Sequence, residues 1–304
     1  METFIQQLIN GLALGGIYAL IALGYTMVYG VLRLINFAHG DVYMLGTFAG
    51  YYTALRLGFS EANPSFFRAA VVLLVAMLFC AVVGLAIERL AYRPIRQASR
   101  LTALITAIGV SLFLENLGQL VFGANPKFFP QLLPPRQFPI YGAACITTPD
   151  LAILSASFVL MLGLHQLVHR TAFGRAVRAV AHDLDTAKLM GIDTNRIIAL
   201  TFALGSALAA AAGILVALRY PKFDPLIGVT TGLKAFIAAV LGGIGNVTGA
   251  VLGGIIIGLA ETMATGYLPA ALNPYKDAVA FAILVTVLLV RPTGILGTTA
   301  PEKV

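Results

Sequence analysis

Two short polar stretches interrupt the apolar segments of this sequence, and each contains glycine. Residues 34–41 read LINFAHGD and place Asn36, His39 and Asp41 within six positions. Residues 242–249 read GGIGNVTG and place Asn246 among four glycines. A glycine-broken membrane helix is tolerated only where its freed backbone groups face protein or water. Two such breaks in different halves of a chain therefore predict a transport site.

Further polar side chains fall inside segments that are otherwise apolar. Ionisable groups are costly in lipid, so each is a candidate for the transport pathway. The competing interpretation is a buried pair that ties two helices together, and for any single residue it is favoured. Glu115 and Glu261 have the further alternative of facing the outer water layer. As a set, these side chains predict a candidate translocation pathway made of Asn36, His39, Asp41, Thr106, Ser111, Glu115, Asn116, Asn246 and Glu261.

Patterns typical of enzymes and metal sites are incomplete. His165 and His169 have the i, i+4 spacing of a zinc pair, but Gln166 stands where the metalloprotease motif needs a glutamate. The glycine run at 242–249 differs from the dinucleotide fingerprint and lacks its strand–turn–helix setting. No phosphate loop of the GxxxxGK[ST] kind is present. The sequence therefore predicts no catalytic residue, no metal and no cofactor.

The elements that must position these residues are membrane helices. Of the 304 residues, 59% are hydrophobic and 11% are charged, whereas soluble domains have about 45–50% and about 25%. Because a helix needs roughly 20 apolar residues to cross the bilayer, we expect an all-α polytopic bundle. We expect a single transmembrane domain over 1–304 without a soluble domain. Its eight or nine segments are expected near 8–32, 37–58, 66–90, 101–122, 151–169, 197–219, 232–245, 249–268 and 276–291.

The basic residues predict the orientation. The loops 88–100 and 170–196 each contain several arginines or lysines, which places both in the cytoplasm. The proline-rich loop 123–150 between them is then external. Counting helices puts the N-terminus outside and the C-terminus in the cytoplasm. This distribution explains the net charge of +7 better than a nucleic-acid partner does.

The inner loop 170–196 contains a short helix of its own. Residues 175–190 lack proline and glycine, and Ala176, Val180, Leu184 and Ala187 form an apolar stripe. Gly191 follows as a helix-ending glycine. Three roles stay open on this pattern: a surface for a partner protein, a helix resting on membrane lipid, or a solvated connector.

The same loop resembles the cytoplasmic motif of bacterial ABC-importer permeases, in which an alanine-rich helix precedes a glycine. Four further stretches resemble the LivH-type permeases that import branched-chain amino acids, and the resemblance covers essentially the whole chain. They are GLALGGIYAL at 11–20, LINFAHGD at 34–41, KAFIAAVLGGIG at 234–245 and RPTGILG at 291–297.

This resemblance implies a permease domain in the bacterial inner membrane that has no ATPase site of its own. Other subunits supply the energy for transport. The implied partners are a homologous second permease of the LivM kind, two ATPase subunits and a periplasmic substrate-binding protein. The docking role for the ATPases is carried over to Arg178, His182, Asp183, Ala187 and Gly191. His182 departs from the motif, which has an acidic residue there. The alternatives are a urea or short-amide permease and, in another class, an ion-coupled secondary transporter or channel.

Overall fold

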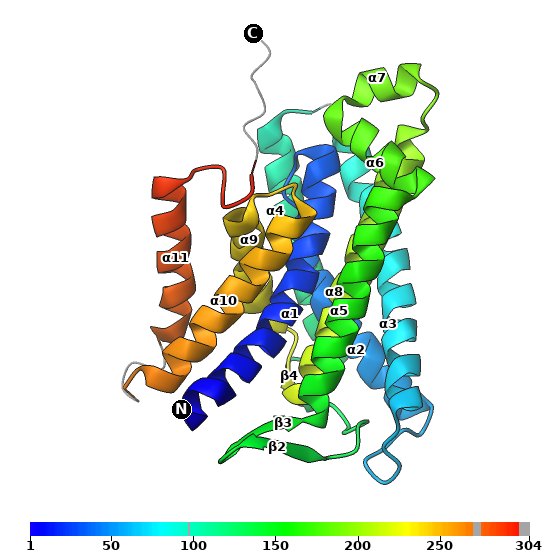
Figure 1. Cartoon of the computed structure of the whole chain (residues 1–304). Coiled ribbons are helices and arrows are strands. Elements are labelled where there is room, and N and C mark those ends of the chain that lie inside the picture. The colour runs from blue at the N-terminus through cyan, green and yellow to red at the C-terminus, as the bar shows by residue number, and fades with distance from the viewer. Residues whose placement is uncertain (97, 270–274, 298–304) are drawn as a thin grey trace.

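The chain folds into a bundle of long helices with a small β-structure at one end (Figure 1). The computed structural model describes residues 1–96, 98–269 and 275–297. Its long helices are α1 Glu2–Leu32, α2 His39–Arg56, α3 Phe66–Ile87, α4 Arg100–Phe122, α5 Thr148–Arg170, α8 Thr194–Arg219, α9 Ile227–Gly242, α10 Val247–Tyr267 and α11 Lys276–Val290. These helices occupy the predicted segments, and the all-α class is confirmed.

The number of spans is lower than predicted when length and apolarity are both required. Within the described residues, six helices are long and apolar enough to cross a membrane. They are α1, α3 together with the helical turns that extend it to Ile95, α4, α5, α8 and α10. Helices α9 and α11 have 16 and 15 residues, fewer than the roughly 20 that a full crossing needs. The count of eight or nine spans is therefore not confirmed.

The core of the bundle is α1. Of the residues in its most apolar 18-residue stretch, 89% are buried. The helix packs against α10, α8, α9 and α5. Glycines permit this close approach: a Cβ at Gly258 would collide with the backbone of Gly15, and one at Gly254 with that of Ala19. Small residues on facing helices let backbones meet in the absence of a hydrophobic drive. The sequence pattern of small residues thus marks helix packing.

The proline-rich segment 123–150, predicted as an external loop, contains β-strands. Strands β2 Gln137–Tyr141 and β3 Ala144–Thr147 form an antiparallel hairpin, and β1 Lys127–Phe128 pairs with β4 Lys222–Phe223. The hairpin and the N-terminus lie at the same end of the bundle, and α6 Ala172–His182 and α7 Leu184–Leu189 lie at the opposite end (Figure 1). We call these the hairpin end and the α6–α7 end.

Candidate functional site

The first predicted break lies buried at the start of α2. Helix α1 ends at Leu32, and Arg33 takes a left-handed conformation with φ of 54°. His39 opens α2, is 1% exposed, and places Nε2 3.2 Å from the carbonyl oxygen of Ile21. Gly24 is required opposite it, because a Cβ there would collide with the imidazole ring. The break is therefore packed against α1.

Asp41 joins this break to α4. Its side chain is buried, and its Oδ2 accepts a hydrogen bond of 2.5 Å from the Ser111 hydroxyl. Glu115 follows one turn along α4 and is half-buried. Gly40 passes α9 closely, since a Cβ there would overlap the carbonyl of Gly228. The N-terminus of α2 is thus the meeting point of α1, α4 and α9.

Aromatic rings surround the same point, and sequence reasoning missed them. Tyr25 stacks edge-on against His39 with ring centroids 4.6 Å apart, and it lies 5.7 Å from Phe236 of α9. Phe37 lies 6.2 Å from Phe236. Polar and aromatic side chains therefore adjoin at one place. Only proximity in the fold reveals this, because the aromatic residues are common in the sequence and Phe236 is distant from Tyr25 along the chain.

Asn36 faces a different helix. It is buried, and its Oδ1 accepts a hydrogen bond of 2.9 Å from the Tyr92 hydroxyl. Tyr92 belongs to the turn η1 Glu88–Tyr92, which continues α3 and is followed by a short 3₁₀ turn, η2 Arg93–Ile95. The first break is therefore connected to the end of α3.

Glu261 belongs to a separate ionic cluster. Its carboxylate accepts hydrogen bonds from Lys234 Nζ at 2.8 Å and from the Tyr18 hydroxyl at 2.7 Å. Lys234 also pairs with Asp277 at 2.7 Å. The cluster ties α1, α9, α10 and α11 together, which is the helix-tying role that competed with a pathway role.

The remaining pathway candidates bond locally. Asn246 caps α10: its Oδ1 accepts from the Gly249 amide at 3.1 Å, and its Nδ2 donates to the Leu296 carbonyl at 2.9 Å. Thr106 and Asn116 donate to carbonyls of their own helix, at 2.9 and 2.7 Å. The structure thus gathers His39, Asp41 and Ser111 around one helix start, with Asn36 and Glu115 nearby, and leaves the other candidates apart.

The prediction of one continuous inner helix over 175–190 is wrong. Two helices, α6 and α7, meet at Asp183, whose extended backbone (φ −153°) ends the first. The physical reason is capping: Asp183 Oδ1 accepts from the amides of Asp185 and Thr186, at 3.0 and 2.9 Å, and so starts a new helix. An aspartate favours such a cap over a position inside a helix.

The end of α7 is as predicted. Gly191 has φ of 81°, its amide donates to Lys188, and the Ile192 amide donates to Ala187. This is the double hydrogen-bond pattern of a glycine-ended helix. Just before it, Leu189 and Met190 are 87% and 78% exposed. These two apolar side chains are surface candidates that were missed, although their place beside the glycine could have signalled them.

The predicted docking residues divide by environment. Arg178 donates through Nη1 to the Val168 carbonyl and so fastens α6 to α5. His182 is exposed and Ala187 is buried. Of the predicted apolar stripe, Val180 and Ala187 are buried, while Ala176 and Leu184 are half-buried. Arg178 and Asp183 therefore shape the segment, whereas His182, Leu189 and Met190 present its surface.

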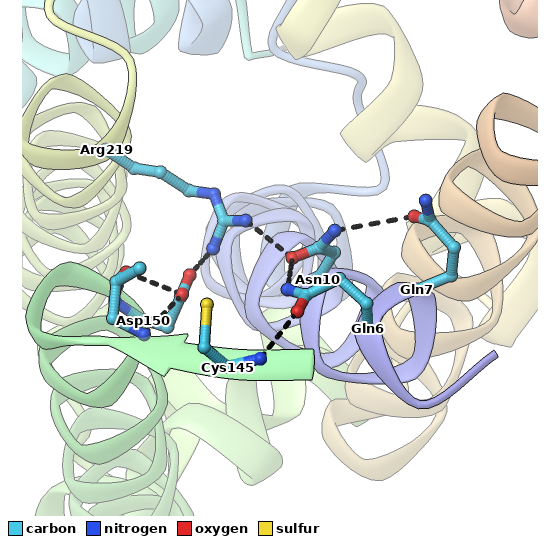
Figure 2. A network of polar contacts seen from close by, with 7 residues as sticks. Gln6, Gln7, Asn10, Cys145, Asp150 and Arg219 are labelled. Atoms are coloured by element: carbon cyan, nitrogen blue, oxygen red, sulfur yellow. Dashed lines mark hydrogen bonds and ion pairs between the residues drawn. The ribbon is translucent and has the colours of Figure 1, made fainter. Parts of the chain in front are cut away.

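A polar network closes the hairpin end of the bundle (Figure 2). Arg219, the last residue of α8, forms an ion pair with Asp150 and donates to Asn10 Oδ1 at 2.8 Å. Gln6 of α1 accepts from the Cys145 amide of β3 at 2.9 Å. Asp150 also completes a capping box with Thr147 at the start of α5. The network joins α1, α5, α8 and the hairpin.

The histidine pair does not extend into a metal site among the described residues, where no group of three metal-binding side chains is found. The rings of His165 and His169 stack with centroids 4.2 Å apart. His169 Nδ1 lies 3.0 Å from the carbonyl oxygen of His165. The pair therefore packs along one face of α5.

Comparison with known proteins identifies the class of this helical bundle. Residues 7–288 match the family described as the permease component of the branched-chain amino acid transport system. The chain belongs to this permease family. LivH of Salmonella typhimurium is 46% identical over 306 residues, covering 99% of this chain and 98% of the relative.

Two further relatives agree. LivH of Escherichia coli K12 is 45% identical and BraD of Pseudomonas aeruginosa is 44% identical, each across 99% of this chain and 98% of the relative. Each is named a permease protein of a high-affinity branched-chain amino acid transport system. The resemblance of the quoted motifs is confirmed, and the chain is a permease component and not an enzyme.

Proposed function

We propose that this permease is the membrane subunit of an ATP-driven importer that carries branched-chain amino acids across the bacterial inner membrane. The observation that carries the proposal is the identity of 44–46% over nearly the full length to permeases named for that transport. In the membrane orientation that we propose, the α6–α7 end faces the cytoplasm and the hairpin end faces outward. This agrees with the arginines and lysines of the loops 88–100 and 170–196.

The ATPase subunits dock on α6 and α7. The exposed side chains of His182, Leu189 and Met190 offer a mixed polar and apolar surface there. The contact of Arg178 with Val168 fastens this segment to α5, and only residues 190–193 separate α7 from α8. A displacement of α6 and α7 by the ATPases therefore acts on two long helices.

The substrate passes the N-terminus of α2. A branched-chain amino acid has an ammonium group and an apolar side chain, and this point combines a carboxylate with aromatic rings. Among the described residues, the ion pairs do not include Asp41, whereas Glu261 is paired with Lys234. Asp41 is thus available to an ammonium group, and Phe37 and Phe236 are available to the apolar side chain.

The other subunits meet the remaining surfaces. A second permease of the LivM kind completes the membrane part, two ATPases bind from the cytoplasm, and a periplasmic binding protein approaches the hairpin end. Every residue of β2 is exposed at that end, including Phe138 and Ile140, which leaves it open to a partner.

Co-purification tests the assembly. The tagged chain is purified from its native membrane, and the accompanying proteins are identified by mass spectrometry. A Leu189→Ser/Met190→Ser variant is compared with a Leu57→Ser control, because Leu57 is 52% exposed and follows α2 at the opposite end of the bundle. We expect two ATPases and a second permease with the native chain and the control, and loss of the ATPases from the double variant.

Transport by the purified assembly tests the substrate. In vesicles loaded with ATP and supplied with the binding protein, we expect uptake of leucine that valine and isoleucine compete away and urea and acetamide do not. A chain that purifies alone and moves leucine without ATP would contradict the importer and point to a secondary transporter or channel.

A further inference from the structure

The end of α3 contains a widened helical turn with a buried charge. In this turn the Arg93 amide donates to the carbonyl of Glu88, five residues back, where an α-helix uses the fourth. Glu88 is 2% exposed and forms an ion pair with Arg96, whose side chain is 15% exposed. Single π turns of this kind are rare and occur frequently at functional sites.

Arg96 connects this turn to the start of α8. Its Nη1 donates to Asn195 Oδ1 at 2.7 Å. Asn195 is the second residue of α8 and follows closely on the glycine that ends α7. Burial lowers the pKa of the Arg96 guanidinium, and the carboxylate of Glu88 opposes that shift. The guanidinium thus bridges a buried carboxylate and the first turn of α8, which follows the segment on which ATPases are proposed to dock.

The other end of the same turn reaches the first break. Tyr92 is fully buried, packs 5.1 Å from the ring of Phe202 in α8, and donates its hydroxyl to Asn36. Asn36 lies three residues before His39 and five before Asp41. Three contacts and the turn Glu88–Tyr92 therefore connect the start of α8 with the point where the substrate is proposed to pass.

We propose that Asn195, Arg96, Glu88, Tyr92 and Asn36 form a relay that transmits the movement of α6 and α7 to the start of α2. We call these five residues the inner relay. They are positioning residues, and their role rests on the proposed ATP-driven transport. When α8 shifts with the docked segment, Arg96 follows Asn195, the turn at 88–92 follows Arg96, and Asn36 follows Tyr92.

The buried ion pair suits such a role better than it suits stability. Taking a carboxylate and a guanidinium out of water is costly, and an apolar pair of similar volume is often as stable or more so. What a charged pair adds is a defined geometry between the two groups. In the inner relay that geometry keeps the turn in register with α8.

The test separates coupling from stability. Asn195→Ala removes the contact of Arg96 with α8, and Tyr92→Phe removes only the hydroxyl that contacts Asn36. The matched controls are Asn63→Ala, in the loop between α2 and α3, and Tyr29→Phe, on α1. Each variant is reconstituted with its ATPases, second permease and binding protein, and the measured quantity is leucine taken up per ATP hydrolysed.

We expect each relay variant to lower uptake per ATP by about threefold or more, while the controls match the native assembly. The double variant Asn195→Ala/Tyr92→Phe should be no worse than the more severe single variant, because both cut the same relay. Asn195→Ala, at an exposed residue, should lower the unfolding temperature only slightly, so a merely structural role would not explain its loss of uptake per ATP.

The outcomes are distinct. If the native assembly imports leucine with ATP and both relay variants keep the native ratio, the inner relay is wrong and the proposed function stands. A fall of equal size in the controls overturns it as well. If the native assembly shows no ATP-driven import, the proposed function fails, and the relay fails with it.

Discussion

Helix α8 is held by an arginine at each end, and the two attachments differ in kind. At the hairpin end, Arg219 of α8 itself binds Asp150 and Asn10. At the α6–α7 end, Arg96 comes from outside α8 and holds it through the single amide oxygen of Asn195. The first attachment branches to three other elements, and the second is one hydrogen bond at an exposed residue.

This difference separates a fixed end from one that can move. Asp150 is itself held by the amide and hydroxyl of Thr147, at 3.0 and 2.6 Å, so Arg219 binds a carboxylate with little freedom. Asn195 adjoins a short connection with a left-handed glycine at residue 191. We therefore expect α8 to pivot about its hairpin end when α6 and α7 are displaced.

The largest effect should come from Arg219→Ala. The substitution leaves the carboxylate of Asp150, which is 1% exposed, buried without its charge partner. Breaking a buried pair from one side costs about 3–5 kcal/mol of stability. A strongly lowered unfolding temperature is expected, measured with a thiol-reactive dye in a Cys145→Ala background, where the buried Cys80 reports unfolding.

Its companion variant is Arg219→Ala/Asp150→Asn, which removes the unpaired charge and should recover part of the loss. An unchanged unfolding temperature for Arg219→Ala alone would mean that the hairpin end is not the fixed one.

A smaller effect is expected at Gly84, where α3 meets α8 close to the inner relay. A Cβ at this position would overlap Ser206 and approach the Phe202 carbonyl oxygen to 2.8 Å. Overpacking of this kind costs about 1–3 kcal/mol, so Gly84→Ala should lower the unfolding temperature. The matched control is Gly163→Ala on α5, where a Cβ meets open space.

The control should be neutral or slightly stabilising, because glycine is a poor helix former. Equal unfolding temperatures of the two variants would show that the contact between α3 and α8 tolerates an added methyl group. This contact would then not restrict the movement of α8.

A smaller loss of stability still is expected for Asn195→Ala, separate from its effect on coupling. One hydrogen bond at an exposed residue contributes about 0.5–1.5 kcal/mol. The unfolding temperature of this variant, measured with the same thiol-reactive dye, should stay well above that of Arg219→Ala. If the two variants were equally destabilised, the contrast between the ends of α8 would disappear.

The smallest effect should be that of Cys145→Ala. Cys145 contributes its backbone amide to the network through Gln6, and the substitution leaves that amide in place. A change below about 0.5 kcal/mol is expected. A measurable drop in unfolding temperature would assign the cysteine side chain a packing role at the hairpin end.

Sequence patterns predicted the features that depend on neighbouring residues. Apolar runs located the long helices, and Gly191 ends α7 as expected because the requirement for a left-handed residue is local. The break at residues 34–41 also follows from its own composition. The division into two helices at Asp183 could also have been predicted, because an aspartate inside a helical pattern is a capping signal.

Contacts between distant positions could not be predicted in this way. Arg96 and Asn195 are 99 residues apart, and Tyr92 and Asn36 are 56 apart. The pairing of Glu261 with Lys234 depends on the crossing of α9 and α10, so the sequence alone left open whether Glu261 serves transport or ties helices. A polar residue in a span indicates that its side chain has a polar partner, and only the fold identifies that partner.

The central position of α1 has a consequence for how the protein is made. The ribosome releases α1 well before α10, yet the face of α1 at Gly15 packs against Gly258 of α10. At about 5–20 residues per second, more than ten seconds of synthesis separate the two. Throughout that interval the glycine face of α1 has no α10 to bury it, so lipid or a helix made earlier than α10 covers it. Helix α10 thus closes the bundle around a helix that was made well before it.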